Sequence, residues 1–380
     1  MRALKSTRIC YLANASDPHT AKWANHFSSK GCEVHVVSFE DARGISPNVV
    51  VHKLSTRWRS SLRYFTVTDE LKRIIAEVQP ALLHAHYAAG YGTLGRLARF
   101  HPYILSVWGR DVFDVPTKSP LHRVLIKRNL GSANYVCSTS RFMADHTHQY
   151  YKGLIRLTPF GVDCSKFMPC NLQASEPDEF VIGTVKRLEE KYGIEYLIRC
   201  FALLSEKYKG SKKLRLVVAG EGSLKGKLQR LARECGVEEL TQFLGFVPNE
   251  RVPQLLNSFS VFVALSILDS ESFGVAVVEA SACEIPVVIS NVPGMCEVVQ
   301  AGITGLVVPR RNPEAAAEAI STLIENEGLR RGMGTAGRKF VIQNYEWSEN
   351  ASRMERLYQS ILGFDRAVNP GRVELTCSNY

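Results

Sequence analysis

Short apolar segments alternate with helical segments along the first 150 residues, and this alternation restricts the possible folds more than any other feature. The apolar runs are four to six residues long, which is typical of buried strands. Alternating strands and helices form a parallel sheet that is covered on both faces, with its ligand-binding loops at the carboxyl ends of the strands. We predict strands at 9–13, 34–39, 82–86, 103–108 and 135–138, and helices at 20–30, 69–77, 91–100, 120–130 and 141–150.

The composition indicates a globular protein of two domains. The chain has 380 residues, of which 45% are hydrophobic and 22% charged, so it can bury two cores of ordinary size. Its formal net charge of +10 suits nucleic acid, an anionic membrane face or phosphorylated substrates. The sequence has no zinc finger, aromatic RNA-binding motif or arginine-rich tail, so we do not expect nucleic acid as a partner.

The sequence features that bear on location favour the cytoplasm. No run approaches the roughly 18 to 20 apolar residues that cross a bilayer. The basic segment 1–8 is followed by an apolar stretch at 9–13 that we predict to be a strand, because it is too short for a signal peptide. The ten cysteines form no C-x-x-C pair and fit reduced thiols. We expect a cytoplasmic protein, and two basic segments described below also allow a peripheral position on the inner face of the membrane.

The stretch 261–289 combines two carboxylates with a predicted anion-binding helix start. An apolar strand at 261–265 leads through a polar loop to Gly274, which opens a small-residue helix before the next strand at 285–289. Glu271 lies in the loop, and Glu279 lies about one turn inside the helix. The backbone N–H groups at the helix start suit a phosphate, so the arrangement fits a sugar joined to a diphosphate. The alternative is an ordinary exposed helix start with two solvated glutamates.

The residues around this stretch resemble a known family. The run Glu-Ser-Phe-Gly-Val-Ala-Val-Val-Glu-Ala at 271–280, with Ile-Pro-Val-Val at 285–288 and Gly-Leu-Val-Val-Pro at 305–309, is similar to the donor-site signature of the family 4 retaining glycosyltransferases. The resemblance extends from about residue 9 to residue 362.

This resemblance implies an α/β fold of two Rossmann-like domains that face one another across a cleft, the GT-B fold. The first domain, at 1–168, is the acceptor side, and a linker at 169–178 follows it. The domain at 179–345 binds the nucleotide-sugar, a helix at 346–362 crosses back to the first domain, and we expect the tail at 363–380 to be disordered.

The resemblance also assigns roles at the donor site. Glu279 holds the ribose hydroxyls and Glu271 the hydroxyls of the transferred sugar. The segment 187–193 resembles the family's diphosphate clamp, which gives Arg187 and Lys191 to the leaving phosphates, although both could be solvated charges that cap a helix. We take Glu271, Arg187 and Lys191 as the catalytic residues. Further donor contacts are predicted at Gly183, Glu221, Gly222, Phe246, Val247, Ser272, Phe273, Gly274 and Val275.

The first domain contributes loops at three strand ends. The loop 14–20 lacks the Gly-Gly pair of many family members, so we do not expect it to cradle a phosphate. We assign His19 and Thr20 at the helix start either to a plain N-terminal cap, the favoured role, or to an acceptor contact. Alternation along the strand puts His84 and His86 on one side, where a metal could bind, but no third ligand is evident. We expect a buried, hydrogen-bonded His84 and assign His86 to the ligand side. Trp108 stands where many relatives have a histidine that contacts the transferred sugar, and Asp111 follows it in the same loop, so we assign both to the acceptor and sugar side.

These residues together predict a retaining glycosyltransferase, which moves a sugar from a nucleotide diphosphate-sugar to an acceptor hydroxyl. No D-x-D motif is present, so we expect neither a metal nor another cofactor. The resemblance places the reaction in polysaccharide, lipopolysaccharide or glycolipid synthesis, with a lipid-linked or saccharide acceptor. The alternatives are a nucleotide-sugar epimerase on the same architecture and a non-catalytic nucleotide-sugar-binding protein.

Two basic segments of the first domain suggest an anionic membrane surface as a partner. The stretch 57–65 interleaves arginines with tryptophan, tyrosine and phenylalanine, and the stretch 118–128 reads as a basic amphipathic helix. Arginine with aromatic side chains suits an anionic bilayer surface. The alternative is a solvated basic loop and helix whose aromatic residues belong to the core.

Overall fold

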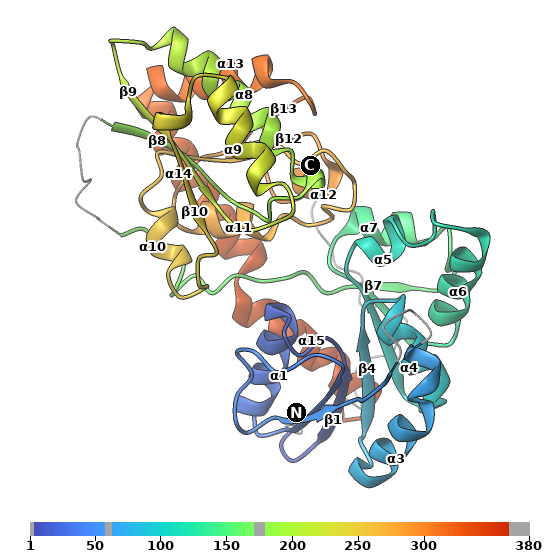
Figure 1. The fold of residues 1–380 in the computed structure, drawn as a ribbon. Coiled ribbons are helices and arrows are strands. Elements are labelled where there is room, and N and C mark those ends of the chain that lie inside the picture. Colours follow the sequence, from blue (N-terminus) through green and yellow to red (C-terminus); the bar gives the residue numbers. More distant parts are fainter. Residues whose placement is uncertain (1–3, 58–62, 171–178, 365–380) are drawn as a thin grey trace. The chain divides into compact units, whose positions relative to one another are not determined.

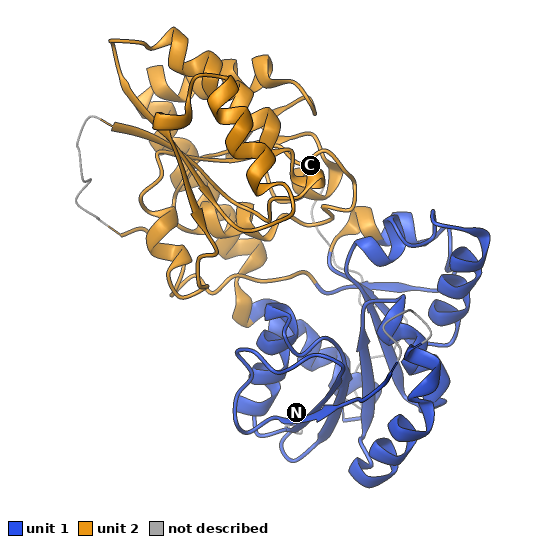
Figure 2. Ribbon diagram, viewed as in Figure 1, with its two compact units in different colours: residues 1–139, 144–158, 349–380 blue, residues 140–143, 159–348 orange. Residues whose placement is uncertain are grey.

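The computed structural model describes residues 4–57, 63–170 and 179–364. The chain forms two compact units, each with its own parallel sheet (Figures 1 and 2). Unit 1 comprises residues 1–139, 144–158 and 349–380, and unit 2 comprises residues 140–143 and 159–348. Two Rossmann-like α/β domains, the predicted fold class, are therefore confirmed.

Unit 1 is built on a seven-stranded sheet in the order β3-β2-β1-β4-β5-β6-β7, and every adjacent pair is parallel. The strand order reverses between β1 and β4: β1 lies between β2 and β4, and its Ile9 pairs with Val34 of β2 and Leu82 of β4. Loops that follow β1, β2, β4 and β5 therefore gather at one edge of the sheet, where doubly wound folds bind ligands. The strands are β1 (Arg8–Leu12), β2 (Glu33–Ser38), β3 (Val50–Lys53), β4 (Leu82–His86), β5 (Tyr103–Val107), β6 (Tyr135–Ser138) and β7 (Ile155–Leu157).

The helices of unit 1 cover this sheet and include the last helix of the chain. Tyr358 of that helix is fully buried, stacks on Phe27 with 4.7 Å between ring centroids, and lies 3.1 Å from the hydroxyl of Tyr11. This packing ties the C-terminal helix to unit 1. The helices are α1 (Pro18–Ser29), α2 (Arg63–Thr66), α3 (Thr68–Val78), α4 (Gly90–Ala98), α5 (Arg110–Phe113), α6 (Pro120–Gly131), α7 (Arg141–Thr147), whose first residues belong to unit 2, and α15 (Trp347–Ile361).

Unit 2, like unit 1, is built on a parallel sheet; it has six strands in the order β10-β9-β8-β11-β12-β13. Its central strands β8 and β11 are neighbours, with Val261 opposite Ile182, so the loops that follow them leave the sheet side by side. The strands are β8 (Glu179–Val185), β9 (Lys213–Ala219), β10 (Thr241–Gly245), β11 (Val261–Ala264), β12 (Val287–Ser290) and β13 (Gly305–Val308).

Helices surround the second sheet and bury its apolar core. Asn312 and Asn326 cap two successive helices by accepting hydrogen bonds from the amides of Ala315 and Leu329. The helices are η1 (Glu190–Tyr192), α8 (Ile194–Lys207), α9 (Lys225–Glu234), η2 (Glu238–Leu240), α10 (Val252–Leu256), α11 (Val275–Ala282), α12 (Pro293–Cys296), α13 (Pro313–Glu325) and α14 (Glu327–Tyr345), where η marks a 3₁₀ helix.

The segment that joins the sheets packs with unit 2 from Pro159 onward, ten residues earlier than the linker predicted at 169–178. The amide of Val162 donates to the carbonyl of Tyr345 at 2.8 Å, and its carbonyl accepts from Trp347 at the same distance. Arg338 donates to the carbonyl of Phe167 at 3.0 Å. Most of the predicted linker, 171–178, lies outside the described residues. Within the described part of the chain, no helix is both long and apolar enough to span a membrane.

Candidate functional site

The loop from β11 to α11 carries the sequence signature, and its backbone is shaped by two glycines. Gly274 adopts φ +85°, in the left-handed region that favours glycine, and α11 begins at the next residue. The loop also lies against α12, because a Cβ on Gly294 would come within 2.4 Å of the backbone of Ser272. The N-terminal amides of α11 are therefore held at the carboxyl edge of the sheet.

Glu271 in this loop is buried between two lysines. Lys186 Nζ lies 2.6 Å from Glu271 Oε1, and Lys191 Nζ lies 3.2 Å from Oε2. The Glu271 residue is only 8% exposed. Burial alone would raise the pKa of Glu271, but the two ammonium groups outweigh it and hold the pKa below its usual value. Glu271 is therefore an ionised carboxylate at neutral pH, and two lysine side chains face it.

Backbone contacts fix the second lysine beside the loop. Lys191 Nζ also donates to the carbonyl of Ser270 at 3.1 Å, and the Lys191 carbonyl accepts from Ile267 at 2.8 Å. Gly193 makes this approach possible: it has φ +61°, and a Cβ there would come within 2.0 Å of the carbonyl oxygen of Leu265. The segment 191–193 and the loop 265–271 are therefore held against each other.

The structure brings Lys191, predicted at the diphosphate, beside Glu271, and the second lysine at this carboxylate is Lys186, the neighbour of the predicted Arg187. The Arg187 side chain is 74% exposed, and the nearest carboxylate among the described residues, that of Glu189, lies 3.9 Å away. Burial alternates along this segment, with Thr184, Lys186 and Leu188 inside. Lys186 was not among the predicted residues, although the period-two pattern of a strand, continued through Leu188, identifies it as an inward-facing side chain.

The remaining predicted donor residues lie at the same carboxyl edge or support it. Gly222 is needed for packing, because a Cβ there would come within 2.3 Å of the Leu188 carbonyl oxygen. Gly183 lies under Phe259, and the Glu221 side chain is half exposed and pairs with Lys225 at 2.9 Å. The Phe246 residue is 74% exposed. Val247, Val275 and Glu279 are half-buried, and Ser272 and Phe273 are buried.

Three buried hydroxyls around the cluster have no hydrogen-bond partner within the described part of the chain: Thr184, Ser266 and Ser270. Thr184 lies at the end of β8, and the two serines lie in the loop with Glu271. Buried polar groups are nearly always satisfied in native proteins. Three buried hydroxyls without a partner in the described residues are consistent with a site that binds a polar ligand.

In unit 1, the structure gathers three residues predicted on the acceptor side. His86, at the end of β4, packs against Trp108 with 4.4 Å between ring centroids and 32° between the ring planes, and His19 lies edge-on to Trp108 at 6.0 Å. Burial lowers the pKa of both histidines, and for His86 the nearby His84 and His19 lower it further. Both imidazoles are therefore neutral at neutral pH and can donate and accept hydrogen bonds. The N-cap of α1 is Asp17, which accepts from the amide of His19 at 2.8 Å.

His84 is buried in the core, as expected. Its Nδ1 lies 2.6 Å from the Tyr358 hydroxyl, and its Nε2 lies 2.8 Å from the Ser106 hydroxyl. Both ring nitrogens are therefore occupied. Among the described residues, no group of three or more His, Cys, Asp or Glu side chains is arranged to hold a metal ion.

Asp111 holds the loops that carry these side chains. It is fully buried and accepts hydrogen bonds from the amides of Ala88 at 2.7 Å, Gly109 at 2.8 Å and Trp108 at 3.1 Å. Burial raises the pKa of Asp111 to about 6, although the three donors act in the opposite direction. Asp111 is thus a positioning residue for Trp108.

Two family models match the chain, one over each sheet. Residues 172–340 match the model described as glycosyl transferases group 1, which includes all six strands of unit 2. Residues 8–140 match the model described as glycosyl transferase 4-like, which includes β1 to β6 of unit 1. The residues around Glu271 and those around Trp108 both fall within these matches.

Individual proteins show the same likeness. An uncharacterized glycosyltransferase of Methanocaldococcus jannaschii is 31% identical over 59% of this chain and 56% of its own length, so the match spans little more than half of that relative. The GDP-mannose-dependent alpha-(1-6)-phosphatidylinositol monomannoside mannosyltransferase of Mycolicibacterium smegmatis is 28% identical over 77% of this chain and 80% of its own. The structure of Anabaena HepE in complex with UDP and glucose superposes with a TM-score of 0.77 and 18% identity, over 93% of this chain and 100% of that one.

The role of Asp111 generates a prediction. Replacing Asp111 by Ala leaves three amides without their acceptor in a buried loop, at a cost of about 1–3 kcal/mol for each. We expect the free energy of unfolding of unit 1, measured by urea denaturation, to fall by at least about 3 kcal/mol. Asp114→Ala is the control: its ion pair with Arg110 is largely exposed, so the loss should stay below about 1 kcal/mol. Equal losses in the two variants would contradict the positioning role.

Proposed function

Because both units of the chain match glycosyl transferase models, one group 1 and the other 4-like, we propose that the protein transfers a sugar from a nucleotide diphosphate-sugar to an acceptor hydroxyl with retention of the anomeric configuration. The observation that carries the proposal is the buried Lys186–Glu271–Lys191 cluster beside the start of α11. HepE was solved with UDP and the mycobacterial relative is named for GDP-mannose, so UDP and GDP are the diphosphates to test.

The two lysines would stabilise the leaving diphosphate. Negative charge grows on the phosphate oxygens as the bond to the sugar breaks, and fixed cations in a buried site stabilise that charge strongly. The amides of Gly274 and Val275 at the start of α11 add a positive helix terminus. Two ammonium groups and these amides supply the positive charge that a metal ion supplies in metal-dependent phosphate sites. We therefore propose that no metal takes part.

The carboxylates would hold the donor's hydroxyl groups. Glu271 is ionised between the lysines, so it accepts hydrogen bonds from sugar hydroxyls next to the diphosphate. The Ser270 hydroxyl is also available there. Glu279, half-buried in the second turn of α11, is assigned to the ribose. The acceptor oxygen then bonds to the anomeric carbon on the face that the phosphate leaves, and a phosphate oxygen takes the acceptor proton, so no side-chain base is required.

The acceptor side would be formed by the His19, His86 and Trp108 cluster of unit 1. Neutral imidazoles hydrogen-bond hydroxyl groups without competing for the diphosphate's charge. Trp108 offers an indole face and one N–H donor. The mycobacterial relative is named for a phosphatidylinositol mannoside, which supports a lipid-linked or saccharide acceptor and a role in envelope polysaccharide or glycolipid synthesis.

A peripheral membrane position rests on α6. Leu121 is 80% exposed and Val124 is 45% exposed, on a helix whose exposed basic residues are Arg123, Lys127 and Arg128, with Lys118 just before it. Apolar side chains ringed by cations suit an anionic bilayer surface. In the other basic stretch, 57–65, residues 58–62 lie outside the described residues. Arg63 pairs with Glu40 at 3.4 Å. The proposal therefore depends on α6.

The first test is Glu271→Gln. We expect sugar transfer from UDP- or GDP-sugars, measured in excess chelator, to fall at least about 100-fold. Affinity for the nucleotide diphosphate should not fall, because both lysines remain. Glu250→Gln, in an exposed loop after β10, is the matched control. If melting shows that Glu271→Gln does not fold, Glu271→Asp replaces it. Transfer at the wild-type rate would remove Glu271 from the site, and loss of wild-type transfer in chelator would contradict the metal-free mechanism.

The second test compares two neighbouring cations. Lys186→Ala should weaken binding of UDP or GDP at least about tenfold, because a hydrogen bond to a charged group contributes about 1.5 to 3 kcal/mol. Arg187→Ala should change the affinity less than about threefold, since the Arg187 side chain is 74% exposed. Isothermal titration calorimetry measures both. The reverse order would show that Arg187 is the diphosphate ligand and that Lys186 only supports Glu271.

The third test concerns the membrane. The protein is centrifuged with vesicles of anionic or neutral lipid at low and high salt. We expect binding to anionic vesicles that is lost in high salt, and at least about tenfold weaker binding after Arg123, Lys127 and Arg128 are changed together to Glu. Changing Lys207, Lys209 and Lys212 of unit 2 together to Glu alters the net charge equally and is the control. Equal weakening by both triple variants, or binding to neither lipid, would contradict docking through α6.

A further inference from the structure

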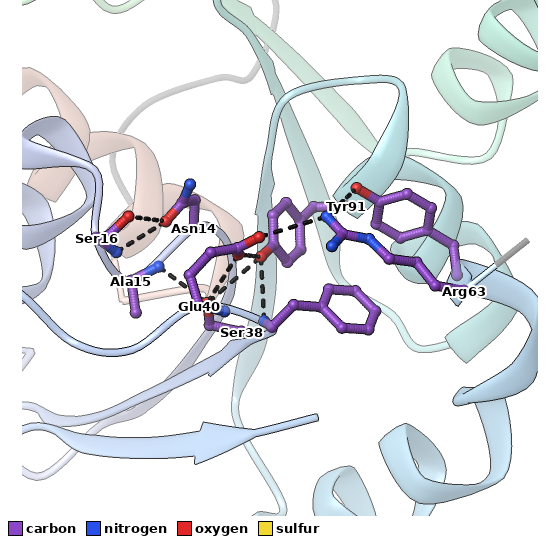
Figure 3. A network of polar contacts seen from close by, with 9 residues as sticks. Asn14, Ala15, Ser16, Ser38, Glu40, Arg63 and Tyr91 are labelled. Carbon is purple, nitrogen blue, oxygen red and sulfur yellow. Dashed lines mark hydrogen bonds and ion pairs between the residues drawn. The ribbon is translucent and has the colours of Figure 1, made fainter. Parts of the chain in front are cut away.

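A second polar cluster lies at the carboxyl edge of the unit 1 sheet, after β2. Tyr91 of α4 donates its hydroxyl to Glu40 Oε2 at 2.5 Å, and Arg63 Nη2 lies 3.4 Å from Glu40 Oε1 (Figure 3). The role of this cluster is not explained by the sites described above. It stands on the same sheet edge that carries His19, His86 and Trp108.

The carboxylate of Glu40 is held in a defined place. The Ser38 hydroxyl oxygen accepts from the amides of Ala15 and Glu40, both at 3.0 Å, which links the loops after β1 and β2 (Figure 3). The amide of Phe39 donates to the Tyr91 hydroxyl at 3.3 Å. Burial raises the pKa of Tyr91, so its hydroxyl keeps the proton that it donates to Glu40.

The guanidinium of Arg63 is equally fixed. It lies over the ring of Phe39, 4.4 Å from the centroid, and over the ring of Tyr64 at 5.0 Å. Tyr64 itself is seated on the first residue of α4, because a Cβ on Gly90 would come within 2.3 Å of its hydroxyl. Stacking holds the plane of the guanidinium. Its Nη2 donates to the Tyr64 hydroxyl at 3.1 Å and also faces Glu40 Oε1 at 3.4 Å.

The pair is reachable from solvent and is loosely joined. The Arg63 side chain is 27% exposed and the Glu40 side chain 30% exposed, and their 3.4 Å separation lies at the long end for a hydrogen bond. A carboxylate that only accepts and a guanidinium that only donates stand side by side. A ligand with two hydroxyls on neighbouring carbon atoms complements this pair, because one hydroxyl can donate to the carboxylate while the other accepts from the guanidinium. Glu40 would repel an anion and Arg63 a cation, so the matching group is neutral.

We propose that Glu40 and Arg63 bind the vicinal hydroxyls of a neutral ring polyol, a saccharide or cyclitol unit of the acceptor. The proposal rests on the glycosyl transfer proposed above and names the acceptor chemistry that this transfer uses. Tyr91 and Ser38 position Glu40 for that contact. Arg63, which the sequence analysis assigned to a membrane surface, is a substrate-binding residue in this account.

The test measures binding of small probes to the full chain by saturation-transfer NMR titration. The vicinal-diol probes are myo-inositol and methyl α-D-mannopyranoside, trans-1,4-cyclohexanediol lacks neighbouring hydroxyls, and glycerol 3-phosphate tests an anion. We expect both diol probes to bind and the other two not to. Glu40→Gln and Arg63→Lys should each weaken diol binding at least about tenfold. Asp41→Asn is the matched control, because Asp41 is 82% exposed and pairs only with Lys53 among the described residues.

Each outcome decides the proposal. Binding of neither diol, a preference for glycerol 3-phosphate, or equal diol binding by wild type and Glu40→Gln would overturn it and leave a plain structural ion pair. Melting temperatures of the variants exclude loss of the fold as the cause of weaker binding. Wild-type protein that binds UDP or GDP but no diol would overturn this inference alone. Protein that binds the diols but neither diphosphate would contradict the proposed transfer and leave the polyol site standing.

Discussion

The buried ionic cluster of unit 2 is the interaction on which the rest of this account depends. Two ammonium groups and one carboxylate are costly to remove from water, and they persist only where each compensates the others. Lys186 and Lys191 approach the two oxygens of Glu271 at 2.6 and 3.2 Å, so two lysines face one carboxylate in this cluster. A diphosphate bound beside the cluster would bring negative charge to this excess of lysines.

Lys186, Lys191 and Glu271 lie together because they follow two strands that are neighbours in the sheet. Adjacent pairing of β8 with β11 sets the segment after Val185 beside the loop after Ala264. Close approach of these segments requires glycine, as at Gly193, where a Cβ would come within 2.0 Å of a carbonyl oxygen. The turn after β9 likewise requires Gly220, whose Cβ would come within 1.9 Å of the Lys186 carbonyl oxygen. The strand pairing and the glycines that shape the fold therefore also fix the positions of the residues in the site.

The sequence predicted the alternating architecture and the carboxyl-edge loops, because strand length, helix starts and glycine positions are local properties. Side-chain partners were harder to predict. Arg187 was chosen over Lys186 from a motif, whereas the burial alternation through Thr184 and Leu188 decides between them. Arg63 was assigned to a membrane because its partner Glu40 lies 23 residues away in the chain, in another loop. A contact between residues that far apart in the chain leaves no pattern in the sequence around either residue.

The most direct measurement of the central claim is hydrogen–deuterium exchange of the intact protein with and without UDP or GDP. The account predicts that the bound diphosphate slows exchange at 186–193 and 265–279, the two segments that meet at the ionic cluster, by at least about tenfold. The loops of unit 1 after β2 and β4 should be unaffected by the diphosphate alone. Diphosphate binding that leaves 186–193 and 265–279 unprotected would contradict the assignment of the cluster as the donor site.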